Sequence, residues 1–66
     1  MTMAEQIMQA RKRAGMTQSE LAKQLNVTNK AVSRWETGGG MPDIIQLVPL
    51  CRVLDLSLQE LLDRVE

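Results

Sequence analysis

The sequence lacks most of the side chains on which enzymatic and metal chemistry depends. Histidine, tyrosine and phenylalanine are absent, and the 66 residues include one cysteine and one tryptophan. Without histidine the chain has neither the usual general base nor the commonest metal ligand, so we predict that it is not an enzyme and holds no metal or other cofactor. A chain this short also buries only a thin core, which leaves little room for a deep cavity, and no site for a small-molecule substrate is evident.

The single cysteine and the shortage of long apolar segments indicate the compartment. Cys51 has no partner for an internal disulfide, and its apolar neighbours Leu50 and Leu54 indicate a buried hydrophobe rather than a reactive thiol. The first ten residues have no long apolar run behind a basic cluster, so neither a signal peptide nor a membrane span is predicted. We therefore expect one domain over residues 1–66, located in the reducing cytoplasm.

The formal net charge is zero, yet the two halves of the chain carry opposite charge. Residues 1–35 have six basic and two acidic residues, a net charge of +4, whereas residues 36–66 have two basic and six acidic residues, a net charge of −4. A dipolar domain can turn its basic side toward phosphates and its acidic side away. Taken alone, the asymmetry is equally compatible with chance scatter of surface charge.

Helix signals recur along the chain, and no segment alternates apolar and polar residues as a strand does. A Ser or Thr followed three residues later by Glu forms a capping box, in which each side chain satisfies a free backbone N–H group. Such boxes start at Thr2, Thr17 and Ser57. Val27 and Val32 flank Thr28 as a hydrophobic staple, which predicts a helix start there as well. The spacing of apolar residues predicts helices over 3–14, 18–24 and 29–35, a fourth around Leu50 and a fifth from about residue 58.

The residues between these segments predict turns. Gly15 and Asn26 are placed to adopt positive φ at the ends of the first two helices. Only a tight turn separates Leu25 from Thr28, and two short helices joined so closely form a helix-turn-helix. The three consecutive glycines at 38–40 predict a surface loop.

Pro49 complicates the fourth helix. A proline inside a helix removes one backbone hydrogen bond and clashes with the preceding turn, whereas it is tolerated in the first turn. Either the helix is kinked at Pro49 or it begins late. We favour a start near residues 45–47, with residues 42–46 as an irregular turn.

The helix predicted at about 28–35 has an apolar inner side and a polar outer side. Val32 and Trp35 face inward, and we expect Trp35 to be a core residue rather than one that stacks on a base. The outward residues are Asn29, Lys30, Ser33 and Arg34. Asn can bond adenine, and Lys and Arg can donate to guanine O6 and N7, so these four are candidate DNA base-reading residues. A solvated polar face without a function is the alternative.

Four segments together resemble a known family: TQSELAKQLNVT (17–28), AVSRWE (31–36), PD (42–43) and LSLQELL (56–62). They are similar to the lambdoid-repressor family of helix-turn-helix regulators, also called Cro/C1 or Xre-like, and the resemblance covers essentially the whole chain. It implies an all-α, compact five-helix bundle of the lambda-repressor-like DNA-binding type, in which the second and third helices form the helix-turn-helix. The function it implies is a sequence-specific DNA-binding transcriptional regulator, expected to be a repressor, that reads the major groove with its third helix.

The resemblance also implies contacts outside the reading helix. Gln18 lies at a helix start, where free N–H groups and the helix dipole favour a phosphate oxygen. It matches a glutamine of the family that contacts the DNA backbone and can brace a residue of the recognition helix. Thr28 and Lys23 are the other candidate phosphate contacts. The family pairs an arginine at the position of Arg11 with the glutamate that matches Glu36, which implies a structural ion pair. The residues at Gly39, Gly40 and Pro49 are unusual for the family.

A module of this size contacts few base pairs, so we expect a homodimer on two half-sites of double-stranded DNA about one helical turn apart. Candidates for the dimer surface are Leu58, Leu62 and Val65, although the leucines could instead complete the core. The rival to DNA binding is a protein-interaction module, such as an antitoxin or scaffold partner, that has the same fold without binding DNA.

Overall fold

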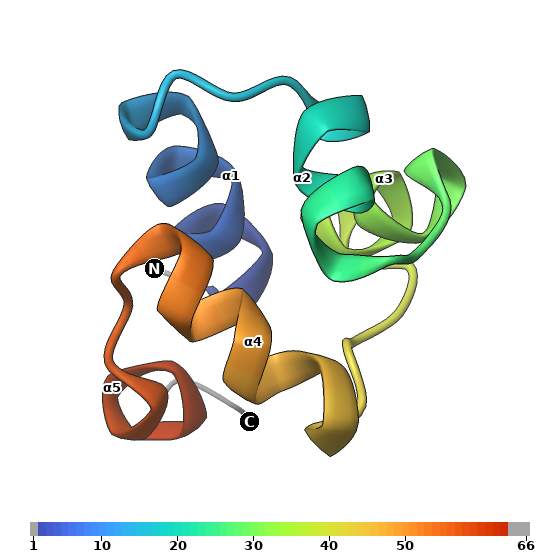
Figure 1. Ribbon diagram of the computed structural model, residues 1–66. Coiled ribbons are helices and arrows are strands. Elements are labelled where there is room, and N and C mark those ends of the chain that lie inside the picture. The colour runs from blue at the N-terminus through green and yellow to red at the C-terminus, as the bar shows by residue number, and fades with distance from the viewer. Residues whose placement is uncertain (1, 64–66) are drawn as a thin grey trace.

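The computed structural model describes residues 2–63, and within that range it contains five α-helices and no strand (Figure 1). The helices are α1 (Met3–Arg13), α2 (Gln18–Leu25), α3 (Asn29–Thr37), α4 (Ile44–Leu54) and α5 (Leu58–Asp63). Helix α3 packs against α1 and α2, and α4 packs against α1, α2 and α5. The predicted all-α, five-helix class is therefore confirmed.

The helix starts follow from local hydrogen bonds at the caps. The side-chain oxygens of Thr2, Thr17 and Thr28 each accept a backbone N–H three residues later, at 3.1 to 3.2 Å. At Thr2 and Thr17 the glutamate of the capping box also accepts the N–H of the cap residue, which completes the box. Ser57 Oγ accepts the N–H of Glu60 at 3.2 Å at the start of α5. The four predicted starts are confirmed.

The turns between the first three helices also have the predicted backbone conformation. Gly15 has a φ of 73° and Asn26 a φ of 58°. Asn is one of the few residues with a side chain that accept this left-handed conformation, which lets α2 end and α3 begin within three residues. Helix α3 extends two residues beyond the predicted end, because Thr37 Oγ1 donates to the Ser33 carbonyl at 3.0 Å and Gly38, at φ 82°, ends the helix instead.

The prediction for the start of α4 was wrong. The helix begins at Ile44, and Asp43 caps it through a reciprocal box: Asp43 N–H donates to Gln46 Oε1, and Gln46 N–H donates to Asp43 Oδ1, both at 3.3 Å. Pro49 therefore lies in the sixth position of the helix and not in its first turn. The carbonyl that loses its helical partner belongs to Ile45, which is 82% exposed, so solvent can satisfy it.

The core draws side chains from all five helices. Trp35 is 5% exposed and Cys51 is 7% exposed, so both predictions of a core position are confirmed. Burial raises the pKa of the Cys51 thiol, which keeps it protonated and unreactive. The buried apolar residues are Met3, Ile7, Ala10, Leu21, Ala22, Leu25, Val32, Trp35, Leu47, Leu50, Cys51, Leu54 and Leu61. Within residues 2–63, none of the helices has the length and apolar character needed to span a bilayer.

Candidate nucleic-acid interface

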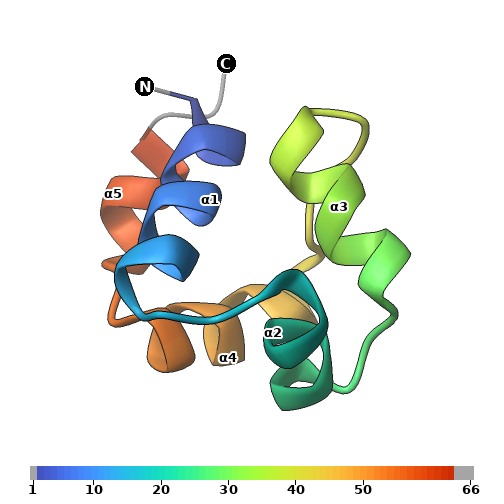
Figure 2. The ribbon, with the colours of Figure 1, turned by 90° about the horizontal axis from the view of Figure 1, so that it is seen from above.

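One side of α3 carries the four residues predicted to read bases. Asn29, Lys30 and Arg34 are exposed, and Ser33 is half-buried. Their spacing places them on a common helix face, opposite the buried Val32 and Trp35. Helix α3 runs along one edge of the molecule (Figure 2). The structure thus brings the four side chains onto a single outward surface.

Two of the three candidate phosphate contacts are exposed to solvent. Lys23, on α2, is exposed, and so is Thr28, which precedes α3. The Thr28 oxygen accepts the N–H of Ala31 at 3.1 Å, and its hydroxyl hydrogen can still be donated to another group.

Gln18, the third candidate phosphate contact, is half-buried and is hydrogen-bonded within the chain. Its amide Nε2 donates to Glu36 Oε1 at 3.0 Å, so Gln18 braces a residue of α3, as the family resemblance implies. The second amide hydrogen remains available to a phosphate.

Glu36 is buried beneath α3 and paired with Arg11. The Glu36 carboxylate accepts from Arg11 Nε at 2.6 Å and from Arg11 Nη2 at 3.0 Å, and the side chains of Arg11 and Glu36 are 11% and 2% exposed. Arg11 Nη1 also donates to the carbonyl of Met16 at 2.8 Å. The hydrogen bond to Glu36 raises the pKa of Arg11, so the guanidinium is always charged. This ion pair connects α1 to the C-terminal half of α3.

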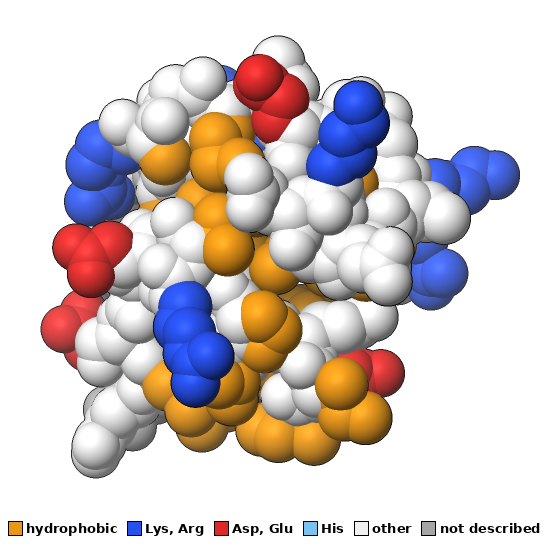
Figure 3. All heavy atoms as spheres, in the orientation of Figure 1, with side chains coloured by type: hydrophobic (Ala, Val, Ile, Leu, Met, Phe, Trp, Pro, Cys, Tyr) orange, Lys and Arg blue, Asp and Glu red, His pale blue; other side chains and the backbone are white. Residues whose placement is uncertain are grey.

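Because Glu36 points inward, its negative charge does not lie on the outer surface of the helix-turn-helix unit (residues 17–37). Residues 17–37 contain two carboxylates, and the other one, Glu20, accepts the Thr17 N–H at 2.8 Å at the start of α2. The exposed cations of this unit are Lys23, Lys30 and Arg34. Lys and Arg side chains project from the surface over α2 and α3, at the right of Figure 3. The outward face of α3 therefore presents amide, hydroxyl and cationic groups without a carboxylate, a combination suited to nucleic acid.

Arg34 is the one predicted base-reading residue whose side chain contacts the backbone of the following loop. Its Nη2 donates to the carbonyl oxygen of Gly39 at 3.2 Å. The guanidinium is thereby directed toward the C-terminal end of α3, whereas Asn29 and Lys30 lie in the first turn of the helix.

A helix-turn-helix family model matches residues 7–61, which include all of α2, α3 and α4. The chain belongs to this helix-turn-helix family. Its relative BcrR of Enterococcus faecalis, named as a transcriptional activator, is 36% identical over 62 residues, which are 94% of this chain and 30% of BcrR. The chain spans between 30% and 57% of the length of the curated relatives that it matches.

Solved structures with the same fold include two proteins in complex with DNA. The P22 c2 repressor, solved with a synthetic operator, has a TM-score of 0.88 and 33% sequence identity over 92% of both chains. SinR of Bacillus subtilis, a biofilm regulator solved with DNA, has a TM-score of 0.84 and 35% identity over 94% of this helix-turn-helix chain and 100% of that chain. The predicted lambda-repressor-like fold is confirmed.

The helix-turn-helix chain also exposes large apolar side chains in and just before α4. These are Met41 (58% exposed), Ile44 (63%), Ile45 (82%) and Val48 (38%), here called the α4 apolar face. Apolar side chains gather along the lower edge of the molecule in Figure 3. Of the residues predicted to form a dimer surface, Leu62 is 45% exposed, Leu58 packs against the core, and Val65 lies outside the described residues.

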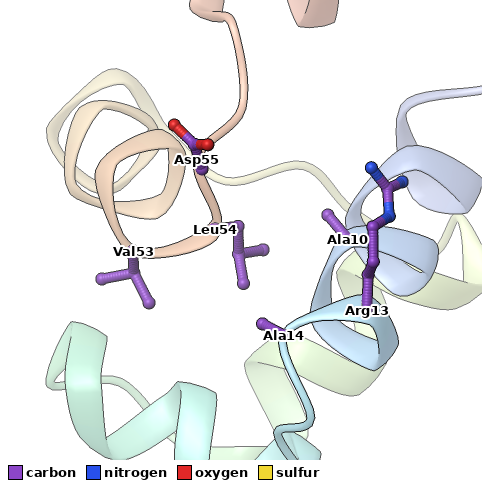
Figure 4. A pocket seen from close by; sticks show the side chains of 6 residues that line it. All are labelled: Ala10, Arg13, Ala14, Val53, Leu54 and Asp55. Carbon is purple, nitrogen blue, oxygen red and sulfur yellow. The ribbon is translucent and has the colours of Figure 1, made fainter.

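A hollow of about 250 Å³ lies between the ends of α1 and α4, and its lining does not include α3 (Figure 4). Its lining is Ala10, Arg13, Ala14, Val53, Leu54 and Asp55. Arg13 contributes a guanidinium and Asp55 a carboxylate, and the other four lining side chains are small or apolar. Within residues 2–63, no three His, Cys, Asp or Glu side chains are grouped as metal ligands. The candidate functional surface of the helix-turn-helix chain is therefore the outward side of α2 and α3.

Proposed function

We propose that this chain is the sequence-specific DNA-binding domain of a transcriptional regulator, and that α3 enters the major groove. The observation that carries the proposal is the outward face of α3, which is polar and cationic because its one carboxylate, Glu36, is buried against Arg11. The fold shared with P22 c2 and SinR, both solved with DNA, supports it. The activity is binding without catalysis, in the cytoplasm, and we propose repression because the P22 c2 protein is named a repressor.

The proposed roles follow from the hydrogen-bonding chemistry of each side chain. Asn29 bonds adenine, Lys30 and Arg34 donate to guanine, and Ser33 donates to or accepts from either base. Lys23 and the free hydrogens of Gln18 and Thr28 contact phosphates, which fixes the register of α3 in the groove.

Lys30→Ala is expected to weaken binding to a selected operator by about 1–3 kcal/mol, roughly fivefold to 150-fold, without changing the melting temperature. Lys30 is exposed, so its loss removes a base contact and no core packing. The operator is first selected from a random DNA pool, and affinity is then measured by fluorescence polarisation over a range of salt concentrations. Wild-type affinity should fall steeply as salt rises, because binding releases counterions from the phosphates.

Arg52→Ala is the matched control, because Arg52 is an exposed cation on α4, away from the reading helix. An equal loss of affinity in both variants would show that net charge alone drives binding and that α3 does not read bases. A wild-type chain without salt-dependent affinity for any duplex would favour the rival, a protein-interaction module, and would refute the proposal.

We further propose that the chain binds DNA as a homodimer and that the α4 apolar face joins the two copies. Large apolar side chains that stay exposed on so small a domain favour an interaction surface. The face begins three residues after Gly38, the residue that ends α3, so pairing two copies through it holds two reading helices at a fixed separation. This choice replaces the surface expected on α5, because Leu58 is used in the core.

Ile45→Glu is expected to convert the dimer to a monomer in analytical ultracentrifugation while leaving the melting temperature of the monomer unchanged. Ile45 is 82% exposed, so the charge is hydrated in the monomer and buried only between two copies. Affinity for an operator with two half-sites should fall to that for one half-site. Leu62→Glu is the matched variant on α5, and a monomer formed by Leu62→Glu but not by Ile45→Glu would move the interface to α5.

A further inference from the structure

The three glycines after α3 hold both the backbone and the side chain of Arg34. The Arg34 carbonyl accepts the N–H groups of Gly38 and Gly39, the second at 2.9 Å. The Arg34 guanidinium returns to the same loop, where Nη2 donates to the Gly39 carbonyl at 3.2 Å. The loop therefore holds both the backbone carbonyl and the guanidinium of Arg34, a residue of the proposed reading surface.

The Arg34 guanidinium lies close to Gly40, in the space next to the missing side chain. A Cβ atom at Gly40 would lie 3.4 Å from Arg34 Nη2 and 3.7 Å from both Cζ and Nε. Three atoms of the guanidinium therefore lie within van der Waals distance of the position that a side chain at Gly40 would occupy. A single methyl group at these distances makes ordinary van der Waals contact. Valine adds two further carbons beyond Cβ, so we expect it to compete with the guanidinium for this space.

The neighbouring glycine differs in this respect. A Cβ at Gly39 would approach the Arg34 carbonyl at 3.8 Å and Thr37 Oγ1 at 3.9 Å, and no guanidinium atom is among these contacts. Neither Gly39 nor Gly40 has positive φ, so both backbone conformations accept a side chain. An alanine at Gly39 thus adds a methyl group to the same loop without approaching the guanidinium.

We propose that Gly40 is a positioning residue for DNA recognition, whose bare backbone orders the Arg34 guanidinium before DNA binds. The inference rests on the proposed function of α3. An unrestrained arginine loses side-chain freedom when it contacts a base, and prior ordering reduces that loss. The bond to Gly39 uses one of the five N–H donors, so the others remain for the duplex. Arg34 follows Lys30 by one helical turn, so the group that Gly40 orders lies next to Lys30 on the proposed reading surface.

The docking of Arg34 is tested first without DNA, by NMR relaxation of the Arg34 Nε–H group. We expect an ordered side chain in the wild type, in Gly39→Ala and in Gly40→Ala, and a mobile one in Gly40→Val, while the melting temperatures agree. Equal mobility of Arg34 in the wild type and Gly40→Val would overturn the inference. This readout does not depend on whether the chain binds DNA.

The consequence for recognition is tested with a double-mutant cycle on the selected operator. Gly40→Val should lower affinity about threefold to tenfold, the effect of one hydrogen bond, and should have no effect in the Arg34→Ala background. Base preference should relax at the one operator position that also relaxes in Arg34→Ala, and Gly39→Ala should change neither. Additive effects of the two substitutions would overturn the inference.

Failure of this inference can be distinguished from failure of the proposed function. If the wild type binds no duplex, the proposed function is wrong and the recognition role of Gly40 is wrong with it. If the wild type binds, Lys30→Ala weakens binding and Gly40→Val does not, only the role of Gly40 is wrong.

Discussion

Trp35→Ala is expected to lower the free energy of unfolding by about 3–5 kcal/mol, because it leaves a large cavity under α3. Trp35 is 5% exposed and faces the core from the side of α3 opposite Lys30. A domain of this size has a total stability of only about 3–10 kcal/mol, so the substitution removes a large part of it. Thermal and urea unfolding followed by far-UV circular dichroism measure the change, since tryptophan emission is lost with the residue.

Trp35→Phe is the control for volume, because it retains an aromatic ring in the core and should cost much less than alanine. Lys30→Ala is the control for position, because it changes the same helix on its exposed side and should leave unfolding unaltered. A Trp35→Ala variant that melted like the wild type but lost DNA binding would place Trp35 at the interface and not in the core.

Glu36→Leu is expected to destabilise the fold by about 3–5 kcal/mol, because it leaves the charge of Arg11 without a partner at a largely desolvated position. The Arg11 side chain is 11% exposed and makes two of its hydrogen bonds to Glu36, and Gln18 Nε2 loses its acceptor as well. With about 4–8 °C for each kcal/mol in a domain of this size, the melting temperature should fall by more than about 12 °C.

The double variant Arg11→Met with Glu36→Leu separates the cost of an unpaired charge from the value of the ion pair. It should be more stable than Glu36→Leu alone, because an apolar pair leaves no buried charge behind. A double-mutant cycle over the four proteins gives the coupling free energy between the two sites. If Glu36→Leu alone cost less than about 1 kcal/mol, the range of exposed ion pairs, the pair would be solvated and would not hold α3 in place.

The helix boundaries could be predicted wherever a local chemical pattern determines them. Thr2, Thr17, Thr28 and Ser57 cap helices through bonds that reach only three residues along the chain, so the sequence contains all the partners. The start of α4 was mispredicted because the presence of Pro49 was given more weight than the Asp43 to Gln46 spacing, which forms the same kind of box. A proline deeper in the helix is tolerated here because the carbonyl it frees is on an exposed residue.

The surface of α3 could be predicted because helical periodicity alone assigns its inner and outer sides. The contact of Arg34 with Gly39 could not, since it depends on the path of a glycine loop. The bond of Gln18 to α3 was implied by the family resemblance, but its acceptor, Glu36, depends on how α2 and α3 cross. The exposed side of α4 could not be predicted either. The helix has apolar residues on both sides, and periodicity does not tell whether Leu47 and Leu50 or Ile44 and Ile45 face the core.

The attachment of α3 has a consequence for the shape of the DNA in the proposed complex. Trp35 and Val32 bury the inner side of the helix, and Glu36 joins it to α1 and α2 through Arg11 and Gln18. Helix α3 therefore cannot tilt to follow an ill-fitting groove without breaking the core. Any misfit between two half-sites must be absorbed by bending or twisting the duplex, so base steps that no side chain touches contribute to operator choice through their stiffness.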